Sequence, residues 1–257
     1  MNKNLYMVAI VASTVATVLV GCGRSGDTSI VAVPEGIEIT ARHHTITNEE
    51  GGKVFAEGTY PEIILSDECT GKYPKLDEFI KDFNAKRKAD TTETTASDAE
   101  HAKEFEDMKF SNSEKVEIVR ADDKMVSFRV DSYWEAGAHP MSYVNVINVD
   151  PTTGEELQLA QVLNDKSDLK TEIIEKIKEK YPNLYEEYVE NQEDSFLPDL
   201  ETEPGEDYSI TETGLNLYFD ETTFSYMAMP DEGVELTFPY DEYPNLVKKE
   251  YSLYKSK

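Results

Sequence analysis

The chain has 257 residues, of which 52 are acidic and 25 are basic, so its formal net charge is −27 at pH 7. A surface this acidic repels nucleic acid and anionic lipid, and it attracts cationic proteins at close range. The same charge also keeps an exported protein soluble, and that simpler explanation stays open. The length allows one large domain or two small ones, each with its own core.

The first residues indicate export. Lys3 precedes an apolar stretch over residues 5–20, which is too short to span a bilayer comfortably but suits a signal peptide. The stretch ends in Leu-Val-Gly before Cys22, and this ending resembles the bacterial lipobox, in which the cysteine is acylated on sulfur. We therefore expect a signal peptide over residues 1–21, and a lipidated Cys22 with a tether over residues 22–35. An uncleaved anchor or an ordinary signal peptide is the alternative.

The second cysteine fits this interpretation. Acylation of Cys22 would leave Cys69 without an intramolecular partner, so we expect no disulfide. A small buried hydrophobic residue is the simplest role for Cys69, and a reactive thiol is the alternative.

Strands and one helix are expected in the first half. Residues 37–40 and 54–60 alternate as strands around a turn, and Pro61 is expected to end the second of them. An apolar face at helical spacing predicts a helix from residue 73; its members are Leu76, Phe79, Ile80 and Phe83. Residues 89–102 lack an apolar stripe, which predicts a solvated helix extension or a loose loop.

The chain then continues with hairpins and a second helix. Strands are expected over residues 115–120, 125–134, 142–149, 207–211, 215–219 and 234–238. Gly154 supplies positive φ for the turn after residue 149, and a short return strand is expected over residues 156–159. A helix is expected over residues 168–181 with Ser167 as its N-cap, and a short helix at the C-terminus.

These elements predict an α+β fold, with antiparallel β-sheets, helices packed on one face, and two similar small subdomains.

Three segments of the second half carry a family resemblance. Residues 133–140 read Tyr-Trp-Glu-Ala-Gly-Ala-His-Pro, residues 210–219 read Ile-Thr-Glu-Thr-Gly-Leu-Asn-Leu-Tyr-Phe, and residues 234–240 read Val-Glu-Leu-Thr-Phe-Pro-Tyr. Together they resemble the extracellular domain family named for the anti-sigma factor RsiV. In the first half, Tyr60-Pro61-Glu62 and the helix expected beyond Tyr73 resemble the companion domain that often precedes it, including in peptidoglycan deacetylases. We therefore expect a companion domain over residues 36–134 and an RsiV-like domain over residues 135–257.

The resemblance implies a wall-facing module. Such modules are attached to a sigma regulator that senses lysozyme or to a wall-modifying catalytic domain. The sequence includes neither a cytoplasmic regulatory segment nor a deacetylase domain, so neither activity is carried over.

The candidate binding residues are one histidine and several tyrosines. His139 follows small residues in an expected loop, where a loop-fixing hydrogen bond is an alternative to a binding role. Tyrosines near the C-terminal strands could contact sugar rings or a protein partner: Tyr218, Tyr226, Tyr240 and Tyr243. His43 and His44 are neighbours on a strand and point to opposite faces, so a shared metal ion is awkward. We expect no cofactor and no metal.

The sequence thus favours a non-enzymatic lipoprotein on the extracellular face of the cell membrane, with an acidic domain that binds a cationic protein such as lysozyme. A module that binds peptidoglycan or another glycan of the envelope is one alternative. A hydrolase, or a lipoprotein accessory to a deacetylase, is the other.

Overall fold

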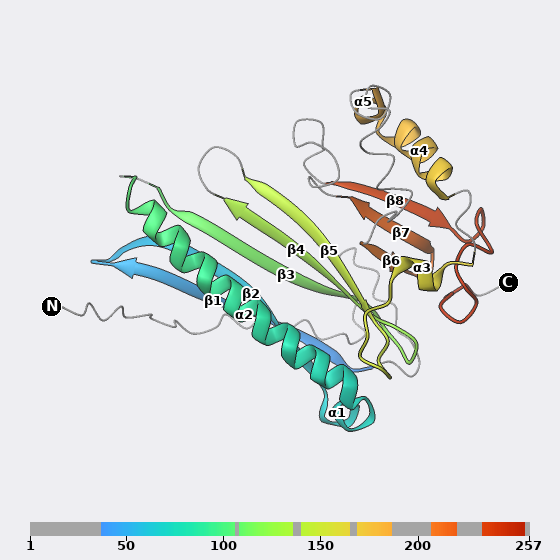
Figure 1. Ribbon diagram of the computed structural model, residues 1–257, viewed down its shortest axis with the longest axis horizontal. Coiled ribbons are helices and arrows are strands. Elements are labelled where there is room, and N and C mark those ends of the chain that lie inside the picture. Colours follow the sequence, from blue (N-terminus) through green and yellow to red (C-terminus); the bar gives the residue numbers. More distant parts are fainter. Residues whose placement is uncertain are drawn as a thin grey trace, which may run out of the picture.

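The computed structural model describes residues 37–105, 108–135, 140–164, 169–186, 207–219 and 233–254. These residues form two β-sheets with helices beside them, so the predicted α+β class is confirmed (Figure 1). None of the helices in these ranges has both the length and the apolar character that crossing a bilayer requires.

The larger sheet has five strands in the order β1-β2-β3-β4-β5. They are β1 (Ile39–Glu50), β2 (Lys53–Leu65), β3 (Phe110–Ala121), β4 (Val126–Glu135) and β5 (Met141–Val149). All neighbouring strands are antiparallel except β2 and β3, which are parallel. Parallel neighbours need a crossover, and here the helices α1 (Asp67–Lys72) and α2 (Pro74–Ala102) supply it.

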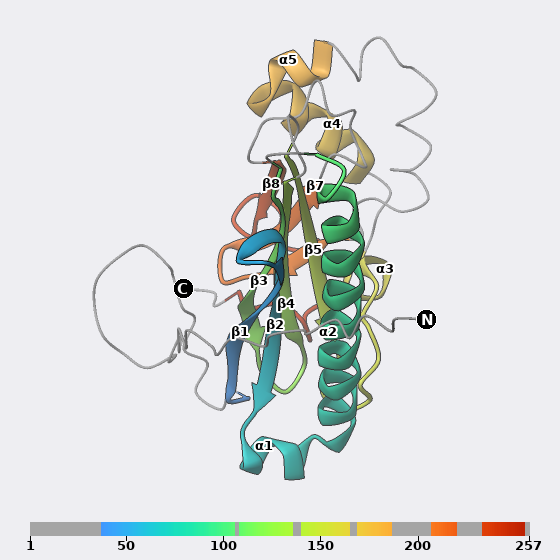
Figure 2. The same ribbon diagram turned by 90° about the vertical axis from the view of Figure 1, so that its left-hand side faces the viewer.

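Helix α2 runs along one face of this sheet (Figures 1 and 2). Its first half buries Leu76, Ile80 and Phe83 in a core that also includes Phe128 of β4. The helix predicted from the apolar spacing is therefore confirmed, and Pro74 occupies its first turn, where a missing N–H costs nothing. Cys69 is buried in the same core, as predicted.

The second half of α2 is packed rather than solvated. Small residues at helical spacing are buried there: Thr91, Thr95, Ala99 and Ala102. They approach β2 so closely that a Cβ on Gly58 would lie 2.1 Å from Thr95 Oγ1. The expected helix extension over residues 89–102 is confirmed, but the expectation that it is solvated was wrong, because close backbone approach needs small side chains and not apolar bulk.

Strands β2 and β3 pair only from Ala56 opposite Phe110 to Thr59 opposite Ser113. Beyond that point side chains replace the missing strand partner. Asn84 of α2 accepts a hydrogen bond from the Ile63 N–H (2.9 Å) and donates one to the Ile63 carbonyl (2.8 Å).

The strand predicted to end at Pro61 continues to Leu65. Past Thr59, β2 has a strand partner on one side only, and proline is tolerated in such edge positions.

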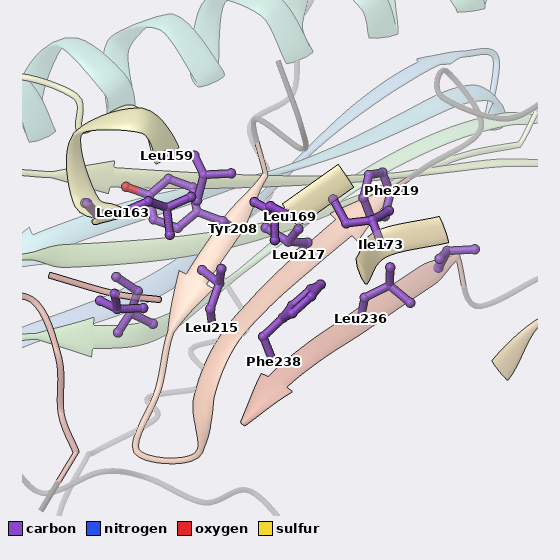
Figure 3. Close-up of a cluster of buried hydrophobic side chains, with 14 of the residues drawn as sticks. Leu159, Leu163, Leu169, Ile173, Tyr208, Leu215, Leu217, Phe219, Leu236 and Phe238 are labelled. Atoms are coloured by element: carbon purple, nitrogen blue, oxygen red, sulfur yellow. The ribbon is translucent and has the colours of Figure 1, made fainter. Parts of the chain in front are cut away.

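The smaller sheet has the order β6-β7-β8, all antiparallel, with β6 (Tyr208–Ile210), β7 (Gly214–Phe219) and β8 (Val234–Pro239). Helix α4 (Leu169–Lys180) packs on it through Leu169, Ile173 and Ile177, and the short helices α3 (Leu159–Val162) and α5 (Pro182–Leu184) lie nearby. Alternate residues of all three strands fill this core, including Leu217, Leu236 and Phe238 (Figure 3). The short terminal helix expected after the last strand is absent from residues 240–254, which form turns.

The two sheets lie side by side, with β6 next to β5 (Figure 1). The buried Asn148 of β5 donates a hydrogen bond to the Tyr208 carbonyl (2.7 Å) and accepts one from Ser127 of β4 (2.6 Å). Strand β5, expected in the second domain, thus pairs with β4 in the first sheet, so the sheet crosses the boundary expected after residue 134. The sheets also differ in size, with five and three strands.

The C-terminal segment is fastened to the larger sheet by a buried ion pair. Arg120 Nε lies 2.7 Å from Asp122 Oδ2, and Arg120 Nη1 donates a hydrogen bond to the Tyr251 carbonyl (2.6 Å). The Asp122 carboxylate also accepts the backbone N–H groups of Lys124 and Met125, which fixes the turn between β3 and β4.

Candidate functional site

A groove of about 650 Å³ lies between α2 and β5, and we call it the α2–β5 groove. Its volume falls within the range of small-ligand sites, although it is open rather than enclosed. Its lining comes from α2, β5, residues 153–158 and Asp207.

One wall is a single face of α2. Glu78 and Phe79 follow Lys75 by three and four residues, Asp82 follows them by four and three, and Lys86 follows Asp82 by four, so all five lie on one face of the helix. Phe79 is half-buried against the core of the larger sheet. This wall therefore combines charged groups with part of an aromatic ring.

The opposite wall is formed by β5 and the turn that follows it. Gly154 has φ of 72°, and a Cβ there would lie 2.6 Å from the Lys75 carbonyl oxygen, so the turn abuts the start of α2. Beyond the turn, Glu156 is exposed and lines the groove. The strand itself contributes the exposed Asn145 and the half-buried Ile147.

Asp207 brings the start of the smaller sheet to the groove. Its Oδ1 accepts hydrogen bonds from the Val146 N–H (2.5 Å) and from Asn145 Nδ2 (3.1 Å). The carboxylate thus occupies the place that a neighbouring strand's carbonyl would take beside β5.

Some charged side chains in and beside the groove form ion pairs, and others do not. Lys75 pairs with Glu78 at 2.8 Å, and Arg87 pairs with Glu114 at 2.8 Å. Burial raises the pKa of the Glu114 carboxyl, although the Arg87 guanidinium acts to lower it. Asp82 and Glu156 are exposed and have no ion-pair partner in the part of the chain that the structure describes.

Elsewhere, many basic side chains are neutralised by carboxylates of the same chain. The described Lys and Arg residues with a carboxylate within 4.0 Å include Lys81, Lys103, Lys109, Arg120, Lys124, Arg129 and Lys176. Because acidic residues outnumber basic ones by 52 to 25, this pairing leaves an excess of carboxylates.

Two of the four candidate binding tyrosines are buried. Tyr218 is 7% exposed and Tyr240 is 3% exposed. Tyr218 OH lies 3.0 Å from Ser209 Oγ, and the Arg129 guanidinium lies 5.0 Å from the centre of the Tyr218 ring. Burial raises the pKa of Tyr218. Neither ring is therefore exposed to a ligand, because Tyr218 faces β4 while Tyr240 packs in the core of the smaller sheet.

Tyr243 is half-buried and held in place by its neighbours. Its hydroxyl donates a hydrogen bond to Glu172 Oε2 (2.7 Å), and its ring packs edge-on against Phe238 at 5.3 Å between centroids. Burial and the bond to Glu172 raise the pKa of Tyr243 to about 12. The remaining candidates, Cys22, His139 and Tyr226, lie outside the described residues.

The neighbouring histidines of β1 have separate partners. His43 Nε2 accepts the Val116 N–H at 3.3 Å, and His44 Nε2 lies 2.8 Å from Glu62 Oε2. Among the described residues no cluster of three or more His, Cys, Asp or Glu is placed to hold a metal ion.

Sequence reasoning missed the α2–β5 groove. Its walls come from residues 75–87, 145–158 and 207, which are distant in sequence, and no local motif connects them. The only sequence feature that pointed to the groove was the alternation of charge on one face of α2, and a solvent-exposed helix has the same pattern.

The fold is shared with solved structures of DUF3298 family proteins. One, from Pseudomonas aeruginosa PAO1, has 19% sequence identity and a TM-score of 0.51, and the match covers 88% of this chain and 99% of that chain. Another, from Bacteroides fragilis NCTC 9343, has 13% identity and a TM-score of 0.53, over 84% of this chain and 95% of that chain. No protein-family model and no curated protein matches the sequence. The class established by these comparisons is therefore the DUF3298 fold.

Proposed function

We propose that this protein is a non-enzymatic bacterial lipoprotein, anchored through Cys22 on the outer side of the cell membrane, that binds a cationic extracellular protein such as lysozyme. The observation that carries the proposal is the internal pairing of its basic side chains on a chain with 52 acidic and 25 basic residues. The surplus carboxylates need counterions, and a basic protein supplies them with a gain in association rate.

The RsiV resemblance supports the choice of partner. Its second segment begins at the last residue of β6 and covers β7, and its third covers β8, so both belong to one folded sheet. The shared DUF3298 fold is compatible with the resemblance and names no ligand.

The direct test is a pull-down of lysozyme and other basic wall enzymes by the purified protein at low and high salt. We expect retention of lysozyme that weakens strongly as salt rises, because exposed charges are screened. An unrelated protein of the same size and net charge is the control. Equal retention by that control would reject a specific partner.

A second candidate is a module that binds peptidoglycan glycan. The α2–β5 groove favours it, because an open polar groove with an aromatic ring and amide groups suits sugar hydroxyls and ring faces. This candidate predicts retention on purified cell-wall sacculi that persists at high salt.

The membrane anchor has its own test. Mass spectrometry of the protein from bacterial membranes should find an N-terminal peptide that begins at Cys22 and carries acyl chains. Detection of residues 1–21 on the mature protein would refute the anchor.

A further inference from the structure

We infer that the α2–β5 groove receives an extended Lys- or Arg-bearing segment of the cationic partner. The inference rests on the proposed function and adds to it the surface that makes the contact.

The two walls of the groove carry carboxylates without ion-pair partners in the described residues. Asp82 lies on α2 and Glu156 lies on the segment after β5, so a segment between the walls meets an acidic group on each side. Of the bases in the lining, Lys75 and Arg87 are already paired with Glu78 and Glu114. Lys86 has no ion-pair partner in the described residues, so one unpaired base faces the two unpaired carboxylates of Asp82 and Glu156. A basic ligand therefore meets less repulsion than the number of basic residues in the lining suggests.

The apolar parts of the lining fit the shape of the same side chains. Phe79 and Ile147 are half-buried and line the groove from the two walls. Lys and Arg have long aliphatic stems that pack on apolar surface while their charged heads stay in water. An aromatic ring also attracts a guanidinium or ammonium group directly. Stem and head together match this lining better than a neutral hydroxylated ligand does.

The groove is held in shape before any ligand arrives. Gly154 abuts the start of α2, and Asp207 is bonded to Val146 and Asn145, so both ends of the β5 wall are fixed. A preformed surface loses little conformational freedom on binding, which favours affinity.

The test compares two variants of the full-length protein that have the same charge change. D82N/E156Q neutralises the groove, and E93Q/E117Q neutralises two exposed carboxylates of α2 and β3 outside it. The probe is lysozyme, with Kd measured by calorimetry at low salt. We expect the groove variant to weaken binding about tenfold and the control variant less than about twofold, since each partly desolvated ion pair contributes a factor of a few.

A second measurement does not depend on mutation. Adding lysozyme to the isotope-labelled protein should shift the NMR signals of the Asn145 side-chain amide, which lies in the groove. The side-chain amide of Asn112, which is bonded to Thr95 under α2, should not shift.

The outcomes separate the two proposals. If lysozyme binds and both variants weaken it equally, with no shift at Asn145, the groove is not the contact and only this inference falls. If the groove variant loses sacculi and keeps lysozyme, the groove holds glycan and the inference is overturned. If the unmodified protein binds no basic protein, the proposed function fails and the inference fails with it.

Discussion

His43 of β1 accepts a hydrogen bond from the backbone N–H of Val116 in β3, at 3.3 Å, beyond the point where the pairing of β2 with β3 ends. The bond requires a neutral imidazole with its proton on Nδ1, because a protonated ring has no acceptor. Burial, reinforced by the positive charges of Lys115 and His44, lowers the pKa of His43.

Acidification should therefore weaken the fold through His43. Its pKa is lower in the folded protein than in the unfolded chain, so the unfolded chain binds the proton more readily as the pH falls. The contribution is fully present above the ordinary pKa of about 6.5 and is lost below it. We expect H43Q, whose amide oxygen can accept the same bond without titrating, to lose less stability than the unmodified protein between neutral and mildly acidic pH. Urea unfolding across that range is the measurement, and parallel pH curves would contradict the prediction.

Asn84 should contribute more to the stability of the fold than the exposed polar residues of α2 do. N84A removes both hydrogen bonds to Ile63 and leaves an N–H and a carbonyl of β2 without partners. We expect a loss of about 2–3 kcal/mol in the free energy of unfolding. E93A, an exposed change on the same helix, should change stability by less than about 0.5 kcal/mol. Similar losses in the two variants would show that Asn84 does not substitute for a strand.

The regular elements could be predicted from sequence because their signals are local. The apolar spacing of Leu76, Ile80 and Phe83 predicted the start of α2, and alternation predicted the strands of the smaller sheet. The gap between β2 and β3 could not be predicted, since His43 and Asn84 fill it with side-chain bonds that have no sequence pattern. The packing of the second half of α2 was missed for a related reason. A run of threonines and alanines occurs both on solvent-exposed helix faces and in close helix–sheet contacts, so the sequence does not distinguish the two.

The candidate site was harder to predict than the fold. Alternation along β7 places Tyr218 on the face opposite the core of the smaller sheet, yet the residue is buried because β4 brings Arg129 over its ring. The α2–β5 groove depends on where α2 lies on the sheet, and the core around Leu76 and the close approach at Gly58 both contribute to that position. The burial of Tyr218 and the formation of the groove thus both depend on contacts between segments that are distant in sequence.

Gly58 should resist substitution for steric reasons. In G58A the new methyl group would lie 2.1 Å from Thr95 Oγ1 and 2.7 Å from Thr91 Cγ2, so α2 must move away from β2. We expect a destabilisation of about 1–3 kcal/mol. G71A is the control, because a Cβ there meets nothing within 4 Å and alanine favours the helix α1. Thermal unfolding compares the two, and G58A/T95A should recover part of the loss. A stability of G58A equal to that of G71A would contradict the close contact.

Arg120 should be the most sensitive charged residue of the described chain, because its side chain is 2% exposed and its partner Asp122 is 8% exposed. R120M leaves the Asp122 carboxylate buried without a cation and also frees the Tyr251 carbonyl. Removing one partner of a buried pair costs about 3–5 kcal/mol, whereas removing both charges costs less. We therefore expect R120M to be much less stable than R120M/D122N in chemical denaturation. The exposed pair of Lys124 and Asp123 supplies the control, since K124M should change stability by less than about 1 kcal/mol. If R120M and K124M unfold at the same denaturant concentration, the pair does not fasten the C-terminal segment to the sheet.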